Sequence, residues 1–172
     1  CEPNPAHKLL SKWEQTGLLK AIITQNIDDL HQQAGSKVIY EFHGNSSRLM
    51  CTICETKYTS SSLIFNNLPP LCEKCNGLLK PDFVFFGEGI PEKAYLNSFE
   101  AAQYCDLCII IGTSGEVSPA NQIPVLAKKS GAVIIEVNMD KSLYTNGVSD
   151  YFLKGSAVEI LSQIDLYLEK NK

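Results

Sequence analysis

The sequence predicts an α/β protein in which a Rossmann-like parallel sheet carries helices on both faces and a small zinc-ribbon module is inserted into the chain. Short apolar runs, such as residues 108–111 and 133–137, alternate with longer amphipathic segments, which is the pattern of parallel β-α-β units. Two C-x2-C pairs interrupt this alternation between residues 51 and 75. Cysteine pairs at such spacing indicate a metal-centred insertion.

The first elements follow from apolar periodicity and from the residues that begin and end helices. Leu9, Leu10 and Trp13 recur at helical spacing before Gly17. The segment 28–35 begins with Asp and ends with Gly, the polarity expected of a short helix. The expected elements are a helix that begins near residue 7 and stops at Gly17, a buried strand over 21–26, a short helix over 28–35 and a strand over 37–44.

The second half of the chain repeats the alternation of strands and helices. Pro91 and Pro119 suit the first turn of a helix, and Gly131 suits a helix end. Ser156 followed by Glu159 matches a capping box. The expected elements are helices over 91–105, 119–131 and 156–170, with strands over 106–114 and 132–138.

The cysteine spacing predicts a zinc site. Cys51, Cys54, Cys72 and Cys75 form two C-x2-C pairs separated by seventeen residues, a spacing that lets two thiolate pairs close a tetrahedron. Disulfides or four unrelated thiols are the alternative. Four thiolates leave zinc no open position, so the metal is expected to fold residues 45–80, otherwise a loop-rich segment, and not to catalyse a reaction.

The composition argues against several classes of partner. The formal charge is −4 and no block of Lys and Arg exceeds a pair, so no basic surface for nucleic acid or an anionic membrane is predicted. No stretch approaches the roughly 20 apolar residues of a membrane span, and residues 1–20 contain no signal-peptide core. A cytoplasmic or nuclear location is therefore expected. The chain opens without Met, as if it began partway through a fold.

Polar residues collect where the expected strands end. Each of them has an ordinary interpretation as a turn or surface residue, but ligands of open α/β sheets bind beyond the carboxyl ends of the strands. Together they favour a binding cleft. The turn at 112–114 can hold phosphate on backbone N–H groups, although the chain has no G-x-G-x-x-G motif. The residues are Thr24, Gln25, Asn26, Asp28, His43, Gly44, Gly112, Thr113, Ser114, Asn138 and Asp140.

These motifs resemble those of the sirtuins. "TQNIDDLH", "FHG", the paired cysteines, "FVFFGE", "GTSGEVSPA" and "VN" occur in the family's order and spacing, from about Asn4 to the last helix. The resemblance implies an NAD-dependent protein lysine deacylase with a Rossmann-like domain over 1–44 and 81–172 and a zinc-binding module over 45–80. It also implies that the family's first β-α unit, with its glycine-rich cofactor loop, is absent before Cys1.

The resemblance assigns roles residue by residue. His43 matches the catalytic base: once the acyl oxygen displaces nicotinamide, a ribose hydroxyl must lose its proton, and an imidazole suits that step. Asn26 and Asp28 are the other catalytic residues. The NAD-binding residues implied are Gln25, Asn26, Ile27, Asp28, Gly112, Thr113, Ser114, Asn138 and Ala157.

The resemblance also implies that an acyl-lysine peptide adds as a strand. Phe86 and Val117 would line the acyl-lysine tunnel, and the Val84 carbonyl would receive the lysine N–H. Composition alone places Phe85 and Phe86 in the core, because aromatic residues are often buried. The substrate-binding residues implied are Val84, Phe85, Phe86, Gly87, Glu88 and Val117.

The expected reaction removes acyl groups from protein lysine and releases nicotinamide and O-acyl-ADP-ribose. Acetyl is the acyl group expected. Asp29, Gly115 and Ser118 depart from the family's usual residues, and Glu116 leads to the hypothesis of a preference for basic peptides. Two alternatives stay open. One is mono-ADP-ribosyl transfer from the same NAD pocket, and the other is a non-catalytic zinc-ribbon interaction module.

Overall fold

The computed structural model describes residues 1–60, 69–85 and 87–171. The elements in chain order are α1 (Pro5–Gln15), β1 (Ile22–Thr24), α2 (Leu30–Gln33), β2 (Ile39–Glu41), β3 (Gly44–Cys51), β4 (Lys57–Thr59), β5 (Leu79–Phe83), α3 (Glu92–Tyr104), β6 (Leu107–Ile111), α4 (Gln122–Lys129), β7 (Val133–Asn138), β8 (Tyr151–Lys154) and α5 (Ala157–Lys170). No helix in these ranges is both long and apolar enough to cross a membrane.

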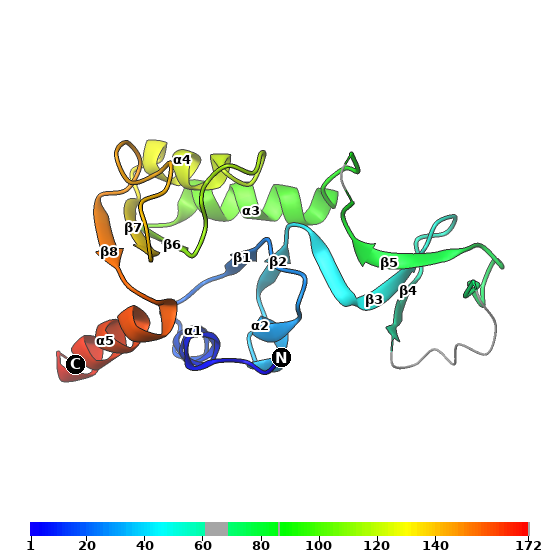
Figure 1. Ribbon diagram of the computed structural model, residues 1–172, viewed down its shortest axis with the longest axis horizontal. Helices are drawn as coiled ribbons and strands as arrows, with labels where there is room; N and C mark the ends of the chain where they lie inside the picture. The colour runs from blue at the N-terminus through cyan, green and yellow to red at the C-terminus, as the bar shows by residue number, and fades with distance from the viewer. Residues whose placement is uncertain (61–68, 86, 172) are drawn as a thin grey trace.

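The strands form three sheets (Figure 1). β1 pairs with β2 in parallel, and β6, β7 and β8 form a second parallel sheet with β7 in the middle. β3 is the central strand of an antiparallel sheet with β4 and β5. In the described part of the chain, no strand pairs with the second edge of β1 or of β6.

Helices cover both faces of the parallel sheets. Ile110 of β6 packs in a cluster with residues of α3 and α4, whereas Ile109 and Ile111 pack against α1 and α5. Ile22 and Ile23 of β1 divide in the same way, because successive side chains of a strand point to opposite faces. Both parallel sheets therefore share the same two cores, which confirms the predicted α/β class with helices on both faces.

Two strands lie where the sequence predicted none. β8 was not predicted, because its four residues, YFLK, are too few to show a strand periodicity. The segment 45–80, expected to be loop-rich, also contains a long strand: β3 extends over eight residues, "GNSSRLMC", and pairs on both sides.

The helix limits also differ in places. Turns around Pro119 precede α4, which begins at Gln122, so Pro119 is not in its first turn. α1 ends at Gln15 with Thr16 as its C-cap, so Gly17 directly follows the helix, as predicted. The expected cap of α5 is confirmed, because Ser156 Oγ accepts a hydrogen bond from the Glu159 N–H at 3.2 Å.

A buried carboxyl group stabilises the segment that follows β7. Glu136 is 0% exposed. It accepts hydrogen bonds from the hydroxyls of Ser142 at 2.6 Å, Thr145 at 2.9 Å and Ser149 at 2.7 Å. Three donors satisfy a group that would be costly to bury alone, so Glu136 ties the segment 142–149 to the central strand of its sheet.

We expect Glu136→Ala to lower the free energy of unfolding by about 3 kcal/mol, because it opens a cavity and leaves three hydroxyls without their acceptor. Urea unfolding followed by circular dichroism measures the change. Glu100→Ala, on an exposed position of α3, is the control and should change the value by less than about 0.5 kcal/mol. Equal effects of the two substitutions would contradict the role of Glu136.

Candidate functional site

The first group of predicted site residues lies where β1 and β2 end. The Phe42 N–H donates to the Thr24 carbonyl at 2.9 Å, which aligns the ends of the two strands. One residue further on, His43 Nδ1 lies 3.1 Å from the Gln25 carbonyl oxygen. The structure therefore brings the half-buried imidazole of His43 to the loop 25–29, as the sequence predicted from parallel strands.

The loop 25–29 is held by its own side chains and by the start of β3. The Asn26 N–H donates to Thr24 Oγ1 at 3.1 Å, and the Leu30 N–H donates to Asp28 Oδ1 at 3.1 Å. Asn26 and Asp28 are exposed, so their remaining polar atoms are accessible to a ligand. Asp29 has a left-handed φ of 65°, a conformation that Asp tolerates better than most residues.

Residues that sequence reasoning missed anchor this loop. The Ser46 N–H and hydroxyl both donate to the Ile27 carbonyl, at 2.8 and 2.7 Å. Asn45 is 1% exposed and donates to Asp29 Oδ1 at 2.7 Å. The one sequence signal for Asn45 and Ser46 is that they directly follow the "FHG" motif.

Gly44 allows the chain to turn into the module at this point. Its φ is 77°, and a Cβ there would collide with the backbone carbonyl of Asp82 on β5. The close approach of β3 and β5 therefore requires glycine, and it sets the direction in which the chain leaves His43.

The second group lies where β6 and β7 end. The Gly112 N–H donates to the Val137 carbonyl at 3.0 Å, and Asn138 Nδ2 donates to the Thr113 carbonyl at 2.9 Å. The Gly155 N–H donates to the Asn138 carbonyl at 3.0 Å, just before α5 begins at Ala157. The structure thus joins the 112–114 turn, Asn138 and the start of α5.

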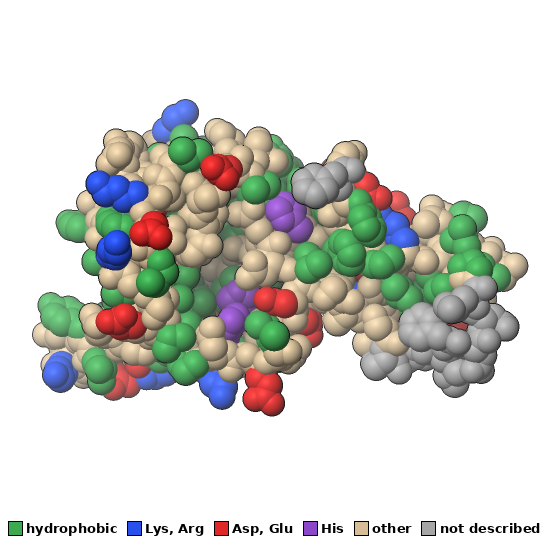
Figure 2. All heavy atoms as spheres, viewed as in Figure 1, with side chains coloured by type: hydrophobic (Ala, Val, Ile, Leu, Met, Phe, Trp, Pro, Cys, Tyr) green, Lys and Arg blue, Asp and Glu red, His purple; other side chains and the backbone are tan. Residues whose placement is uncertain are grey.

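The two groups are not joined to each other by a hydrogen bond within the described ranges. Both follow the carboxyl ends of parallel strands, one in each parallel sheet. Figure 2 shows this face of the molecule hollowed between the part that carries α3 and α4 and the part that carries α1 and α5, with histidine side chains along the hollow. Such a hollow suits an elongated ligand that reaches both groups.

The predicted substrate segment begins beside His43. The Val84 N–H donates to the His43 carbonyl at 3.0 Å, and Lys80 Nζ lies 2.6 Å from Glu88 Oε1. The Lys80 ammonium lowers the pKa of Glu88. Phe85 is 46% exposed, so its composition-based assignment to the core is wrong.

For the other predicted substrate residues that the structure describes, it gives exposure or backbone conformation but no contact with His43. Val117 is 51% exposed. Phe86 lies outside the described residues. Gly87 has a φ of 88° and open space around it.

The four predicted metal ligands come together at one point. All four sulfur atoms lie within 4.8 Å of one another. Among them, Cys51 and Cys75 are 3.4 Å apart, and Cys54 and Cys72 are 3.6 Å apart. Thiolates at 2.3 Å from a tetrahedral zinc ion would be about 3.8 Å apart, so the cluster fits zinc. All four cysteines are free, so the structure does not support the alternative of disulfides.

The two cysteine pairs sit on matching turns. The Glu55 N–H donates to the Cys51 carbonyl, and the Asn76 N–H to the Cys72 carbonyl, at 3.1 and 2.8 Å. Glu55 and Asn76 both have left-handed φ values, 55° and 60°. The Tyr58 hydroxyl lies 3.2 Å from Cys72 Sγ and lowers the pKa of that thiol to about 6. Repeated turns of this kind present both cysteines of a pair to one ion.

Gly77, in the cysteine cluster, is a further position that sequence reasoning missed. A Cβ on Gly77 would lie 2.9 Å from Cys51 Sγ. We expect Gly77→Ala to weaken zinc affinity about tenfold, because it displaces a ligand that backbone packing otherwise orients. Competition with a chromophoric chelator measures this affinity. Gly147→Ala, where a Cβ meets open space, should leave the affinity unchanged, and equal losses in both variants would refute the role of Gly77.

Comparison with known proteins identifies the family. A family model described as "Sir2 family" matches residues 1–119. The chain is 44% identical over 169 residues to an NAD-dependent protein deacylase of Pyrococcus furiosus, covering 95% of this chain and 67% of that protein. The chain belongs to the Sir2 family. This Sir2 chain is also 45% identical to an NAD-dependent protein deacylase of Aeropyrum pernix, over 95% of the chain and 66% of that protein.

Solved Sir2 structures share the fold. A structure of Sir2 bound to an acetylated peptide superposes with a TM-score of 0.88 at 37% identity, covering 96% of this chain and 71% of that one. A complex of Sir2 with a peptide and NAD+ gives 0.87 at 37% identity, over 97% and 70% of the two chains. The present Sir2 chain spans about two-thirds of the length of the curated relatives it matches.

Proposed function

We propose that this Sir2 chain acts in NAD-dependent removal of acetyl and related acyl groups from protein lysine. The observation that carries the proposal is the position of His43, whose Nδ1 lies 3.1 Å from the Gln25 carbonyl at the ends of two parallel strands. The relatives named NAD-dependent protein deacylases support the same reaction.

The contact with Gln25 determines which nitrogen of His43 can act as a base. A carbonyl oxygen only accepts hydrogen bonds, so Nδ1 donates and carries the proton. In the neutral ring Nε2 is then free to accept a proton. The acyl oxygen would first displace nicotinamide from the ribose carbon of NAD. We assign to Nε2 the next step, the removal of a proton from a hydroxyl of the same ribose.

The remaining predicted residues provide binding. Gln25, Asn26, Ile27 and Asp28 would surround the nicotinamide end, while the 112–114 turn, Asn138 and Ala157 would hold the rest of the dinucleotide. The peptide would add as a strand between Val84–Glu88 and Val117, because main-chain pairing tolerates varied sequences. The zinc module would act only by holding β3 and β5, and hence the neighbours of His43, in place.

The experiment is incubation of the chain with NAD and an acetyl-lysine peptide, with both nicotinamide and deacetylated peptide measured by mass spectrometry. The Pyrococcus furiosus relative serves as the positive control. Equal formation of nicotinamide and deacetylated peptide is expected. Nicotinamide release with ADP-ribose attached to protein would show mono-ADP-ribosyl transfer instead, and no product where the control is active would refute the proposal for this chain.

A further inference from the structure

A cavity of about 410 Å³ lies along the outer edge of β2, and none of the predicted NAD-binding residues lines it. Its walls come from β2, from Gly44 and Arg48 of β3, from Lys57 of β4 and from the first turns of α3, including Lys93. No residue of β1 lines it. We propose that this cavity binds a compact organic or inorganic dianion, such as a dicarboxylate or a phosphate group.

The cavity walls contain more positive than negative charge. Lys37, Arg48, Lys57 and Lys93 line it, together with a single carboxylate, Glu41. Cations that line a cleft with walls of low dielectric attract anions more strongly than cations on an open surface do. The cavity volume falls in the range of small-molecule sites.

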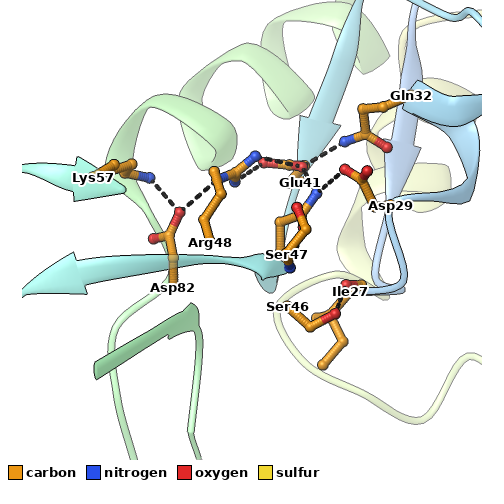
Figure 3. A network of polar contacts seen from close by, with 10 residues as sticks. Ile27, Asp29, Gln32, Glu41, Ser46, Ser47, Arg48, Lys57 and Asp82 are labelled. Atoms are coloured by element: carbon orange, nitrogen blue, oxygen red, sulfur yellow. Dashed lines mark hydrogen bonds and ion pairs between the residues drawn. The ribbon is translucent and has the colours of Figure 1, made fainter. Parts of the chain in front are cut away.

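Two of the four cations are already neutralised (Figure 3). Arg48 pairs with Glu41 and, at 2.9 Å, with Asp82, and Lys57 also pairs with Asp82 at 2.9 Å. Asp82 is 6% exposed, so Arg48 and Lys57 are needed to compensate its buried charge. These four groups sum to zero charge.

The other two cations remain available. In the described part of the chain, neither Lys37 nor Lys93 forms an ion pair. They contribute a charge of +2, which matches a dianion. A monoanion would neutralise only half of this charge.

The backbone of β2 supplies uncharged donors on the same side. The Val38 carbonyl and the Phe42 N–H bond to β1, and backbone groups of a parallel strand alternate in direction. The N–H groups of Ile39 and Glu41 therefore point away from β1, toward the cavity side. Anions are bound well by N–H groups combined with ammonium groups.

Glu41 connects the cavity wall to the predicted cofactor loop. It accepts hydrogen bonds from Gln32 at 2.5 Å and from Asn45 at 2.6 Å, and Asn45 also donates to Asp29. Figure 3 shows Glu41 between Arg48 and Gln32. Because Arg48 and Glu41 both line the cavity, a dianion bound beside them is expected to alter the surroundings of Asp29 through these hydrogen bonds.

The test is titration of the chain with sodium phosphate and, separately, with succinate, followed by backbone amide NMR at low ionic strength. We expect saturable shifts at residues 37–41 and 93–97, with weaker shifts at Asp29 and Asn45. The two arms distinguish a phosphate ligand from a dicarboxylate. Acetate, a monoanion, should bind more weakly, and added salt should weaken all binding.

The double variant Lys37→Gln/Lys93→Gln should weaken dianion binding about fivefold. Lys20→Gln, at an exposed position outside the cavity, is the matched control and should bind like the original chain. If the double variant does not fold, each single variant is titrated instead.

Three results of these titrations would overturn the proposal. They are the absence of saturation with both dianions, equal binding by the double variant and the control, and shifts that map away from the cavity. Binding of an acidic peptide without binding of either dianion would also overturn it, and would indicate strand addition to the β2 edge. The titration contains no NAD, so its outcome is independent of the deacylation assay.

Discussion

His43→Ala is expected to lower the rate of NAD-dependent lysine deacylation by about 100- to 10,000-fold, the usual contribution of a positioned general base. The backbone carbonyl of His43 receives the Val84 N–H and does not depend on the side chain, so the fold should persist. If His43 acts only after nicotinamide leaves, exchange of free labelled nicotinamide into NAD should fall much less than deacylation. Both rates are measured on the same preparation.

The control for this prediction is His7→Ala. His7 is on α1, where its ring lies at a tilt to the ring of His31 with centroids 4.8 Å apart, and its Nδ1 lies 2.8 Å from Asn4 Oδ1. We expect near-normal deacylation from this variant. Equal losses of deacylation and nicotinamide exchange in His43→Ala would assign His43 to NAD binding instead of proton transfer.

Removal of zinc is expected to unfold the antiparallel sheet of β3, β4 and β5 while the parallel sheets remain. Structural zinc sites contribute about 10–16 kcal/mol of binding free energy that is also folding free energy. Among its described residues, the module has only a small apolar cluster of its own, built around Cys51, Cys72 and Leu79. Limited proteolysis before and after chelation should show new cleavage within residues 44–83 only.

Cys51→Ser should reproduce the effect of chelation, because Cys51 is 0% exposed and supplies one of the four sulfur atoms. Zinc content is read by mass spectrometry of the native protein. Cys1→Ser, at an exposed cysteine outside the cluster, should retain a single zinc ion. A chain that keeps its protease resistance after zinc is removed would show that the metal does not hold the module together.

Local sequence predicted the elements whose signals are short in range. The Ser156 cap of α5 and the C-x2-C turns rest on residues two to four positions apart, so covalent spacing brings the groups together. Strand β3 was missed because "GNSSRLMC" has the composition of a loop. Its strand conformation depends on pairing with β5, which ends more than thirty residues later.

The sequence by itself therefore determined the α/β class, the four metal ligands and the polar groups at the strand ends, because periodicity and short spacings encode them. Tertiary structure alone decided which of these groups meet. The pairing of Arg48 with Asp82 joins residues 34 positions apart, and the contacts of Asn45 and Ser46 with the loop 25–29 arise in the same way. Such contacts form only when separate elements pack, and no local pattern records which distant surfaces will face each other.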